Sequence, residues 1–330
     1  MSEPHYTLDL PALDGANPLG FLAALGTLTV LAETDPTIKL GWHARTRWVP
    51  FLKSTTIQDE DALLETLIKT FHRERDSDGI QYPKECEIGE LKKCTPEHFR
   101  DLAKSTTRVA EPKQRRVVDM IAAFGIEQRE ASQVKTNQPI EIQRTPFCFT
   151  TGSGHQELVA DARKLMNGKN TSKTDPNACP GVTKELMRAA LFERWRYDDK
   201  GLSLRWDPSE DTRYALRLEN PSNSGAYTVW MANALAFRAL TLFPCAATKR
   251  TIATTAWNDA QSFSWPIWHA PLSRATIASL LNHRCLSCEF TSTSRKEMRA
   301  RGVDVVFFAR RIQVGSSSQY KTNFAAPSTR

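Results

Sequence analysis

Hydrophobic positions change their spacing from segment to segment along the chain, and the spacing predicts the elements. Residues 5–10 alternate apolar and polar side chains, as a half-buried strand does. Residues 62–71 place apolar side chains three and four positions apart, which is the period of an amphipathic helix. Similar patterns and turn residues predict further helices at 96–104, 113–124, 157–166, 182–194, 227–244 and 274–281. They predict a strand or hairpin at 38–52, which Pro50 should end, and strands at 202–208, 213–220 and 303–315.

The most apolar stretch, DGANPLGFLAALGTLTVL at residues 14–31, lies near the start of the chain. Asn17 suits a helix N-cap, with Pro18 at the first helical position. The predicted helix aligns four leucines on one side: Leu22, Leu25, Leu28 and Leu31. Gly20 and Gly26 would let another backbone pack closely, because they carry no side chain. The run from Pro18 to Ala32 is 15 residues, short of the roughly 20 that a membrane span needs. We therefore expect a core helix.

The order of these elements predicts an α+β fold. A strand, a helix and a strand open the chain, which indicates a mixed N-terminal α/β layer. Residues 167–181 are rich in turn formers and form the best candidate linker, whereas residues 125–145 are polar and predict an exposed loop. We expect an N-terminal domain at 1–166 and, at 182–330, a helical and β-hairpin C-terminal domain with a basic tail.

Composition places the chain among soluble globular proteins. Of its 330 residues, 40% are hydrophobic and 25% are charged, which is enough for a sizeable core. The first residues lack the positive charge of a signal peptide, and an odd number of cysteines, seven, suits a reducing compartment. These features predict a cytoplasmic protein with no membrane association.

The net charge of +7 is concentrated near the C-terminus. From Phe290 onward, eight cationic side chains face two anionic ones, a net charge of +6. A concentrated basic segment is typical of a surface that binds nucleic acid, although it also suits a solvated, solubilising surface. Two groups of cations form the candidate site: Lys113, Arg115 and Arg116, and Arg295, Lys296, Arg299, Arg301, Arg310 and Arg311. Arg295 and Arg299 would share one face of a helix, where their repulsion favours an anionic partner.

Other candidate chemistries have weaker signals. His283, Cys285 and Cys288 could bind zinc, but a structural site needs four ligands, and Cys86 and Cys94 fit poorly as the remainder. Five carboxylates could bind a divalent metal in a nuclease: Asp198, Asp199, Asp207, Glu210 and Asp211. They flank predicted turns, where aspartate is favoured by local hydrogen bonds. The chain has no GxxxxGK[ST], HExxH or GxSxG motif, and we expect no catalytic residue and no cofactor.

Three stretches of the sequence resemble one known family. They are LDGANPLGFLAALGTLTVL, RWRYDDKGLSLRWDPSEDTRYALR and LFPCAATKRTIATTAWNDAQSFSWPIW. The chain resembles the proteins of type I-G (formerly I-U) CRISPR loci, and its opening helix resembles the large subunits of Cascade surveillance complexes.

The resemblance implies a non-catalytic subunit of an RNA-guided effector for antiviral defence. Such large subunits contact the target DNA near its protospacer-adjacent motif (PAM), support R-loop formation and help recruit the helicase-nuclease. The expected partners are guide RNA, target DNA, other Cascade subunits and that helicase-nuclease. In such systems base pairing reads the sequence, while the protein reads a short motif and the backbone. The alternative from the residues themselves is a metal-dependent nuclease, or a nuclease accessory, that uses the carboxylates of 198–211.

Overall fold

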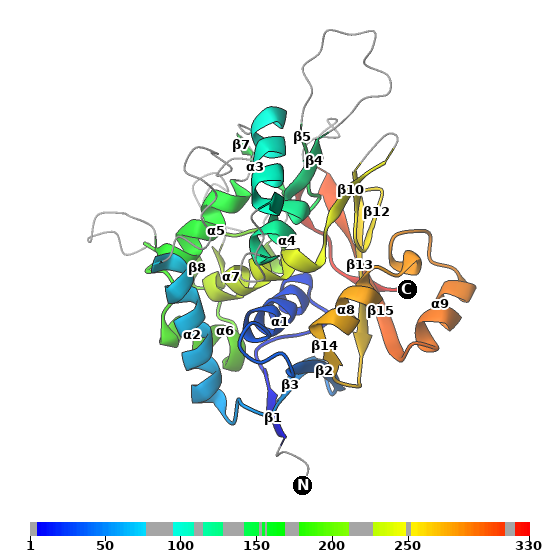
Figure 1. Ribbon diagram of the computed structural model, residues 1–330. Helices are drawn as coiled ribbons and strands as arrows, with labels where there is room; N and C mark the ends of the chain where they lie inside the picture. The colour runs from blue at the N-terminus through cyan, green and yellow to red at the C-terminus, as the bar shows by residue number, and fades with distance from the viewer. Residues whose placement is uncertain are drawn as a thin grey trace, which may run out of the picture.

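The computed structural model places one long apolar helix at the centre of the molecule, with helices and two antiparallel sheets around it (Figure 1). It describes residues 5–76, 95–108, 115–127, 142–151, 154–155, 157–168, 178–210, 227–248, 252–313 and 321–330. The fold has mixed α+β character, which confirms the predicted class.

The central helix, α1 (Pro18–Leu31), is the apolar segment at the start of the sequence. Its predicted cap is confirmed, because the Asn17 side chain accepts hydrogen bonds from the backbone N–H groups of Leu19 at 2.8 Å and Gly20 at 3.4 Å. The sequence predicted one buried side, but all 14 residues of the helix are buried. A helix that is apolar on every face is stable only where protein surrounds it.

The closest neighbour of α1 is α7 (Trp230–Arg238), which continues as a 3₁₀ turn, η4 (Ala239–Leu242). A Cβ atom on Gly26 would lie 1.7 Å from the backbone oxygen of Leu235. A Cβ atom on Gly20 would lie 2.5 Å from the backbone oxygen of Asp14. Both glycines therefore permit close backbone approach, as the sequence predicted.

The remaining helices surround this pair. They are α2 (Glu60–Asp76), α3 (Pro96–Arg108), α4 (Arg115–Phe124), α5 (Leu158–Asn167), α6 (Lys184–Phe192), α8 (Arg274–Leu281) and α9 (Ser292–Arg299). Two further 3₁₀ turns are η3 (Pro208–Glu210) and η5 (Arg284–Leu286). Figure 1 shows α2 and α6 on one side of α1 and α8 on the other, with α9 at the outer edge beside β15.

The first sheet has the order β1-β3-β2-β14, with antiparallel pairs. Its strands are β1 (Tyr6–Asp9), β2 (Lys39–Ala44), β3 (Trp48–Ser54) and β14 (Leu272–Ser273). The prediction that Pro50 ends the strand pattern is wrong, because Pro50 pairs with Trp42 inside β3. Its carbonyl accepts a hydrogen bond from Leu10 at 2.8 Å, just past the end of β1. In a strand, the N–H and C=O of one residue point to the same side, so the donor that Pro50 lacks would face the β1 side. The hydrogen bonds between β3 and β2 therefore do not need it.

The second sheet has the order β12-β13-β15-β16, and β17 also pairs with β15. Its strands are β12 (Trp257–Asn258), β13 (Ser262–Trp268), β15 (Val303–Gln313), β16 (Lys321–Phe324) and β17 (Ser328–Thr329). Every residue of β13 is buried. The indole of Trp265 donates to the Gly15 carbonyl at 2.8 Å, and that of Trp268 donates to the Leu40 carbonyl at 2.9 Å. These bonds attach the second sheet to the α1 segment and to the first sheet.

Four short antiparallel pairs complete the described strands: β4 (Gly125–Glu127) with β5 (Ile142–Arg144), β6 (Thr150–Thr151) with β7 (Gly154–His155), β8 (Asp199–Lys200) with β9 (Tyr227–Thr228), and β10 (Cys245–Ala247) with β11 (Ile252–Thr254). The β4–β5 pair shows that the ends of the predicted 125–145 loop are ordered, while residues 128–141 lie outside the described residues. The predicted strand at 202–208 does not form, because Leu202 (φ 51°) and Arg205 (φ 63°) take left-handed conformations that interrupt an extended chain. The predicted strand at 213–220 lies outside the described residues.

The two predicted domains share one core. A continuous cluster of buried side chains includes α1, α5, α7 and both sheets, and so joins residues before and after the predicted 167–181 linker. Residues 169–177 of that linker lie outside the described residues. Within the described part of the chain, none of the helices has the length and apolarity to cross a membrane.

Gly26→Ala tests the close approach of α1 and α7. Alanine is favoured over glycine by about 1 kcal/mol in an exposed helix. Here we expect a loss of about 2 kcal/mol or more in the free energy of unfolding, since the Leu235 carbonyl occupies the space that the methyl group needs. Urea unfolding followed by circular dichroism measures it. Gly26→Ser should cost more than Gly26→Ala, and an alanine variant as stable as the wild type would contradict this packing.

Candidate nucleic-acid interface

Helix α9 and the turn that follows it present four exposed cationic side chains at the edge of the molecule. We call Arg295, Lys296, Arg299 and Arg301 the α9 basic surface. The Thr291 side chain caps the helix by accepting from the Ser294 backbone N–H at 3.2 Å, and Met298 is buried against the fold. Among the described residues, no ion pair with a carboxylate engages these four cations; Arg301 donates instead to the Glu297 backbone oxygen at 2.8 Å. Exposed charges without a protein counterion are suited to an anionic partner.

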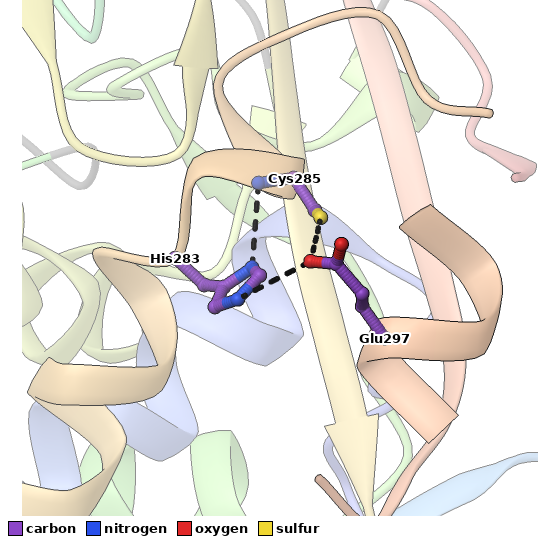
Figure 2. Close-up of side chains that lie close together, drawn as sticks. All are labelled: His283, Cys285 and Glu297. Atoms are coloured by element: carbon purple, nitrogen blue, oxygen red, sulfur yellow. Dashed lines mark hydrogen bonds and ion pairs between the residues drawn. The ribbon is translucent and has the colours of Figure 1, made fainter. Parts of the chain in front are cut away.

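The acidic residue of α9, Glu297, points the other way and anchors the helix (Figure 2). Its carboxylate accepts from the Cys285 thiol at 3.4 Å and lies 3.8 Å from His283 Nε2. Arg284 approaches the same carboxylate at 3.3 Å. Glu297 is therefore engaged by η5, and Arg284, which sequence reasoning missed, adds a largely exposed cation beside the α9 basic surface.

The group of His283, Cys285 and Glu297 differs from the zinc ligands considered from the sequence. Cys288 is exposed and its sulfur contacts the Glu289 carbonyl, whereas Glu297 takes the third place. The potential ligand atoms of the three lie within 4.8 Å of one another. Burial lowers the pKa of His283 and raises the pKa of the Cys285 thiol, which favours a neutral ring and a protonated sulfur.

This chemistry fits a hydrogen-bonded anchor better than a metal site. The thiol donates to Glu297, and His283 Nδ1 accepts from the Cys285 backbone N–H at 3.4 Å, so each group already has a bonding partner. A structural zinc site needs four ligands and thiolate sulfur, and the positive charges of Arg284 and Arg301 next to His283 oppose a cation. Within the part of the chain that the structure describes, His283, Cys285 and Glu297 therefore supply three of the four ligands that a structural zinc site needs.

The two arginines of β15 have different environments. Arg310 is exposed, but it lies roughly 20 Å along the strand from the α9 end of β15. Arg311 turns inward, where it donates to the Cys148 carbonyl at 3.0 Å and stacks over Phe149, with the guanidinium 5.0 Å from the ring centroid. Burial lowers the pKa of Arg311 to about 10. The terminal nitrogens of Arg311 therefore already bond backbone carbonyls of the fold, which makes it a weaker candidate for contact with nucleic acid than Arg310.

The cations predicted at 113–116 also differ in their surroundings. Lys113 lies outside the described residues. Arg115 is exposed and pairs with Asp119, at 2.7 Å from Nε to Oδ1, which raises the pKa of the guanidinium. Arg116 is largely covered and lies 3.1 Å from Glu33. These arginines line a pocket rather than an open track, and they lie on α4, away from α9 (Figure 1).

Three of the five carboxylates considered for a nuclease, those of Asp199, Asp207 and Glu210, accept hydrogen bonds within the fold. The Asp207 side chain is fully buried and accepts hydrogen bonds from the Tyr197 hydroxyl at 2.8 Å and from the Ser209 backbone N–H at 2.9 Å. Asp199 accepts from the Trp230 backbone N–H at 2.7 Å, while Asp198 is exposed. Asp211 lies outside the described residues. Turn and cap chemistry explains these positions without a metal.

Glu210 is the most perturbed of these carboxyl groups. It is buried and accepts from the hydroxyls of Ser203 and Thr228. Burial raises the pKa of Glu210 to about 7, because the two hydroxyl donors only partly replace the lost water. No described cation forms an ion pair with it, so its role is to connect η3 with β9.

Comparisons with known proteins give no match, either to a protein-family model or to a curated protein.

Glu210→Gln tests this buried carboxyl group. The folded pKa of about 7 exceeds the ordinary value of 4.5, so its contribution to stability is complete below about pH 4.5 and is lost as the pH rises toward 7. The wild type should lose about 3 kcal/mol of unfolding free energy from this group across that interval. Glu210→Gln should remove this decline, as measured by urea unfolding at pH 5 and pH 8.

Asp198→Asn changes an exposed neighbouring carboxylate and is the matched control. It should keep the decline of the wild type. Equal pH dependence in Glu210→Gln and the wild type would show that Glu210 is ionised in the folded protein at neutral pH.

Proposed function

We propose that this protein is a non-catalytic, nucleic-acid-binding subunit of a type I-G CRISPR Cascade effector. The observation that carries the binding proposal is the α9 basic surface, in which four exposed cations have no carboxylate partner among the described residues. The sequence resemblance supports the assignment to a Cascade effector, with a role like that of a large subunit at the target DNA near the PAM.

The geometry favours contact with phosphates over reading of bases. Arg295 and Arg299 are one helical turn apart, and Lys296 and Arg301 flank them. Such spacing lets several cations follow one nucleic-acid backbone, which gives affinity without sequence readout. The Glu297 anchor holds the helix by its inner side, so binding requires no rearrangement of α9.

Replacing Arg295, Lys296, Arg299 and Arg301 by alanine tests the binding surface. We expect weaker binding of single- and double-stranded DNA and of RNA, and a shallower dependence of log K on log salt concentration. Each lost phosphate contact should reduce the slope by about 0.9 for duplex DNA and about 0.7 for single strands, up to about four contacts. Fluorescence anisotropy titrations between 50 and 200 mM salt, the interval over which such contacts act, measure both effects.

A charge-matched control replaces four exposed cations elsewhere: Lys69, Lys104, Arg194 and Arg196. They lie on α2, on α3 and after α6, away from α9 (Figure 1). This control should change the slope much less than the α9 variant. An unchanged slope in the α9 variant would remove the α9 basic surface from the proposal.

The assignment to an effector has its own test. The protein purified from its native host should carry RNA of uniform guide length together with other Cascade subunits. The nuclease alternative is tested by adding Mg²⁺ or Mn²⁺ with DNA or RNA to the same material. We expect Asp207→Ala to leave any cleavage unchanged, whereas a loss of cleavage in this variant would favour the nuclease. Purification without RNA would contradict the Cascade assignment. It would not bear on nucleic-acid binding by the α9 basic surface, which the salt titrations test.

A further inference from the structure

The first sheet has one face against α1 and one face toward solvent (Figure 1). Trp42 of β2 lies on the inner face, where its ring stacks on Phe21 of α1 with the centroids 5.7 Å apart. Because side chains alternate along a strand, the neighbours of Trp42 in β2 lie on the opposite face, and the register adds their partners in β3. We call this surface the outer face of the first sheet; its residues are Lys39, Gly41, His43, Val49, Phe51 and Lys53.

Two lysines lie directly opposite each other on the outer face. Lys39 of β2 pairs with Lys53 of β3 in the register of the sheet, so their side chains are neighbours. Like charges at such a position destabilise a sheet. The carboxylate that β1 adds to this face, Asp9, pairs with His43 at 3.4 Å and with Arg45 at 2.6 Å instead. Among the described residues, no carboxylate forms an ion pair with either lysine, so the pair favours an anionic partner.

A stack of rings lies next to the lysine pair. The ring of His43 is nearly parallel to that of Phe51, with 4.1 Å between the centroids and 17° between the planes. A Cβ atom on Gly41 would lie 2.5 Å from the Phe51 ring, so the glycine lets this ring lie across β2. The exposed His269, which follows β13, has its ring centroid 5.9 Å from that of His43. The outer face therefore offers imidazole rings on which another planar ring can stack.

Hydrogen bonds hold the two imidazole rings in place. His269 Nδ1 lies 3.1 Å from the Trp42 carbonyl oxygen, and this nitrogen is the donor because a carbonyl only accepts. His43 Nε2 lies 3.4 Å from the Asp9 carboxylate, whose charge favours a hydrogen on that nitrogen. The other nitrogen of each neutral ring is then an acceptor. Rings fixed in this way lose little freedom when a ligand stacks on them.

We propose that the outer face of the first sheet binds single-stranded RNA, with an unpaired base stacked on His43 and neighbouring phosphates held by Lys39 and Lys53. Bases of a duplex stack on each other, so a protein surface reaches their faces only in single strands. The Asp9 carboxylate beside His43 accepts from a 2′-hydroxyl, a donor that DNA lacks. The inference goes beyond the proposed function, because the outer face shares no residue with the α9 basic surface and contacts bases as well as phosphates.

Fluorescence anisotropy with a short oligouridine and with an abasic RNA of the same length tests the stacking. Both strands carry the same phosphates, so a surface that contacts phosphates alone binds them equally. The wild type should bind the oligouridine at least about fivefold more tightly, which is the effect of one stacked base. His43→Ala should remove this preference. His43→Phe should keep it, because phenylalanine retains a flat ring at the same position.

His98→Ala is the matched control, since it removes an exposed histidine from α3. It should keep the preference for oligouridine. The proposal is overturned if the wild type binds the two strands equally, if His43→Ala keeps the preference, or if His43→Phe loses it. It is also overturned if oligodeoxyuridine binds as tightly as oligouridine.

Lys39→Gln distinguishes a binding role of the lysine pair from a structural one. Removing one of two facing like charges should leave the thermal midpoint equal or higher. The slope of log K against log salt concentration for oligouridine should fall by about 0.7, the effect of one phosphate contact on a single strand. Lys104→Gln, which changes an exposed lysine of α3, should leave the slope unchanged. An unchanged slope in Lys39→Gln would overturn the contact between phosphates and the lysine pair.

The α9 alanine variant separates this proposal from the one for the α9 basic surface. It should bind both strands more weakly but still prefer oligouridine to the abasic strand. Failure of the α9 basic surface would therefore appear in the salt slope, and failure of the outer face in the preference. Loss of the preference in the α9 variant would assign the stacking to α9 and overturn the role of the outer face.

Discussion

The structure depends on the burial of α1 on every side. The helix can lie at the centre only because Gly26 lets the Leu235 carbonyl of α7 approach to a distance that any side chain would prevent. Close packing of this kind leaves little room for adjustment, since protein interiors are as dense as organic crystals. The crossing of α1 and α7 therefore fixes the frame against which the outer helices pack.

Both proposed surfaces take their positions from this frame. The ring of Phe21 in α1 stacks on Trp42, which places the outer face of the first sheet away from the core. The indoles of Trp265 and Trp268 attach β13 to the α1 segment and to the first sheet. Strand β15 pairs with β13, and α9 leads directly into β15. A rigid core thus presents cations at two separate places.

Arginine has three physical roles in this protein, and the surroundings decide which one each residue takes. Arg311 is an interior donor to a backbone carbonyl. Arg238 and Arg116 both pair with the carboxylate of Glu33. Arg295 and Arg299 face solvent on α9. Cations that are close in the sequence are therefore not always close in the structure. Arg310 and Arg311, for example, are adjacent in β15 but point to opposite faces of the sheet.

The sequence by itself determined the α+β class, the capped start of α1, the close approach at Gly20 and Gly26, and the exposed cations of α9, because these follow from local spacing and propensity. It misplaced the end of β3 and the chain at 202–208, where pairing partners and backbone angles are set by distant residues. Only the tertiary structure decided that α1 is covered on all faces, that Glu297 replaces Cys288 beside His283, and that His269 lies beside His43. Those groupings arise from contacts between segments far apart in the chain, and no local pattern records which segments will meet.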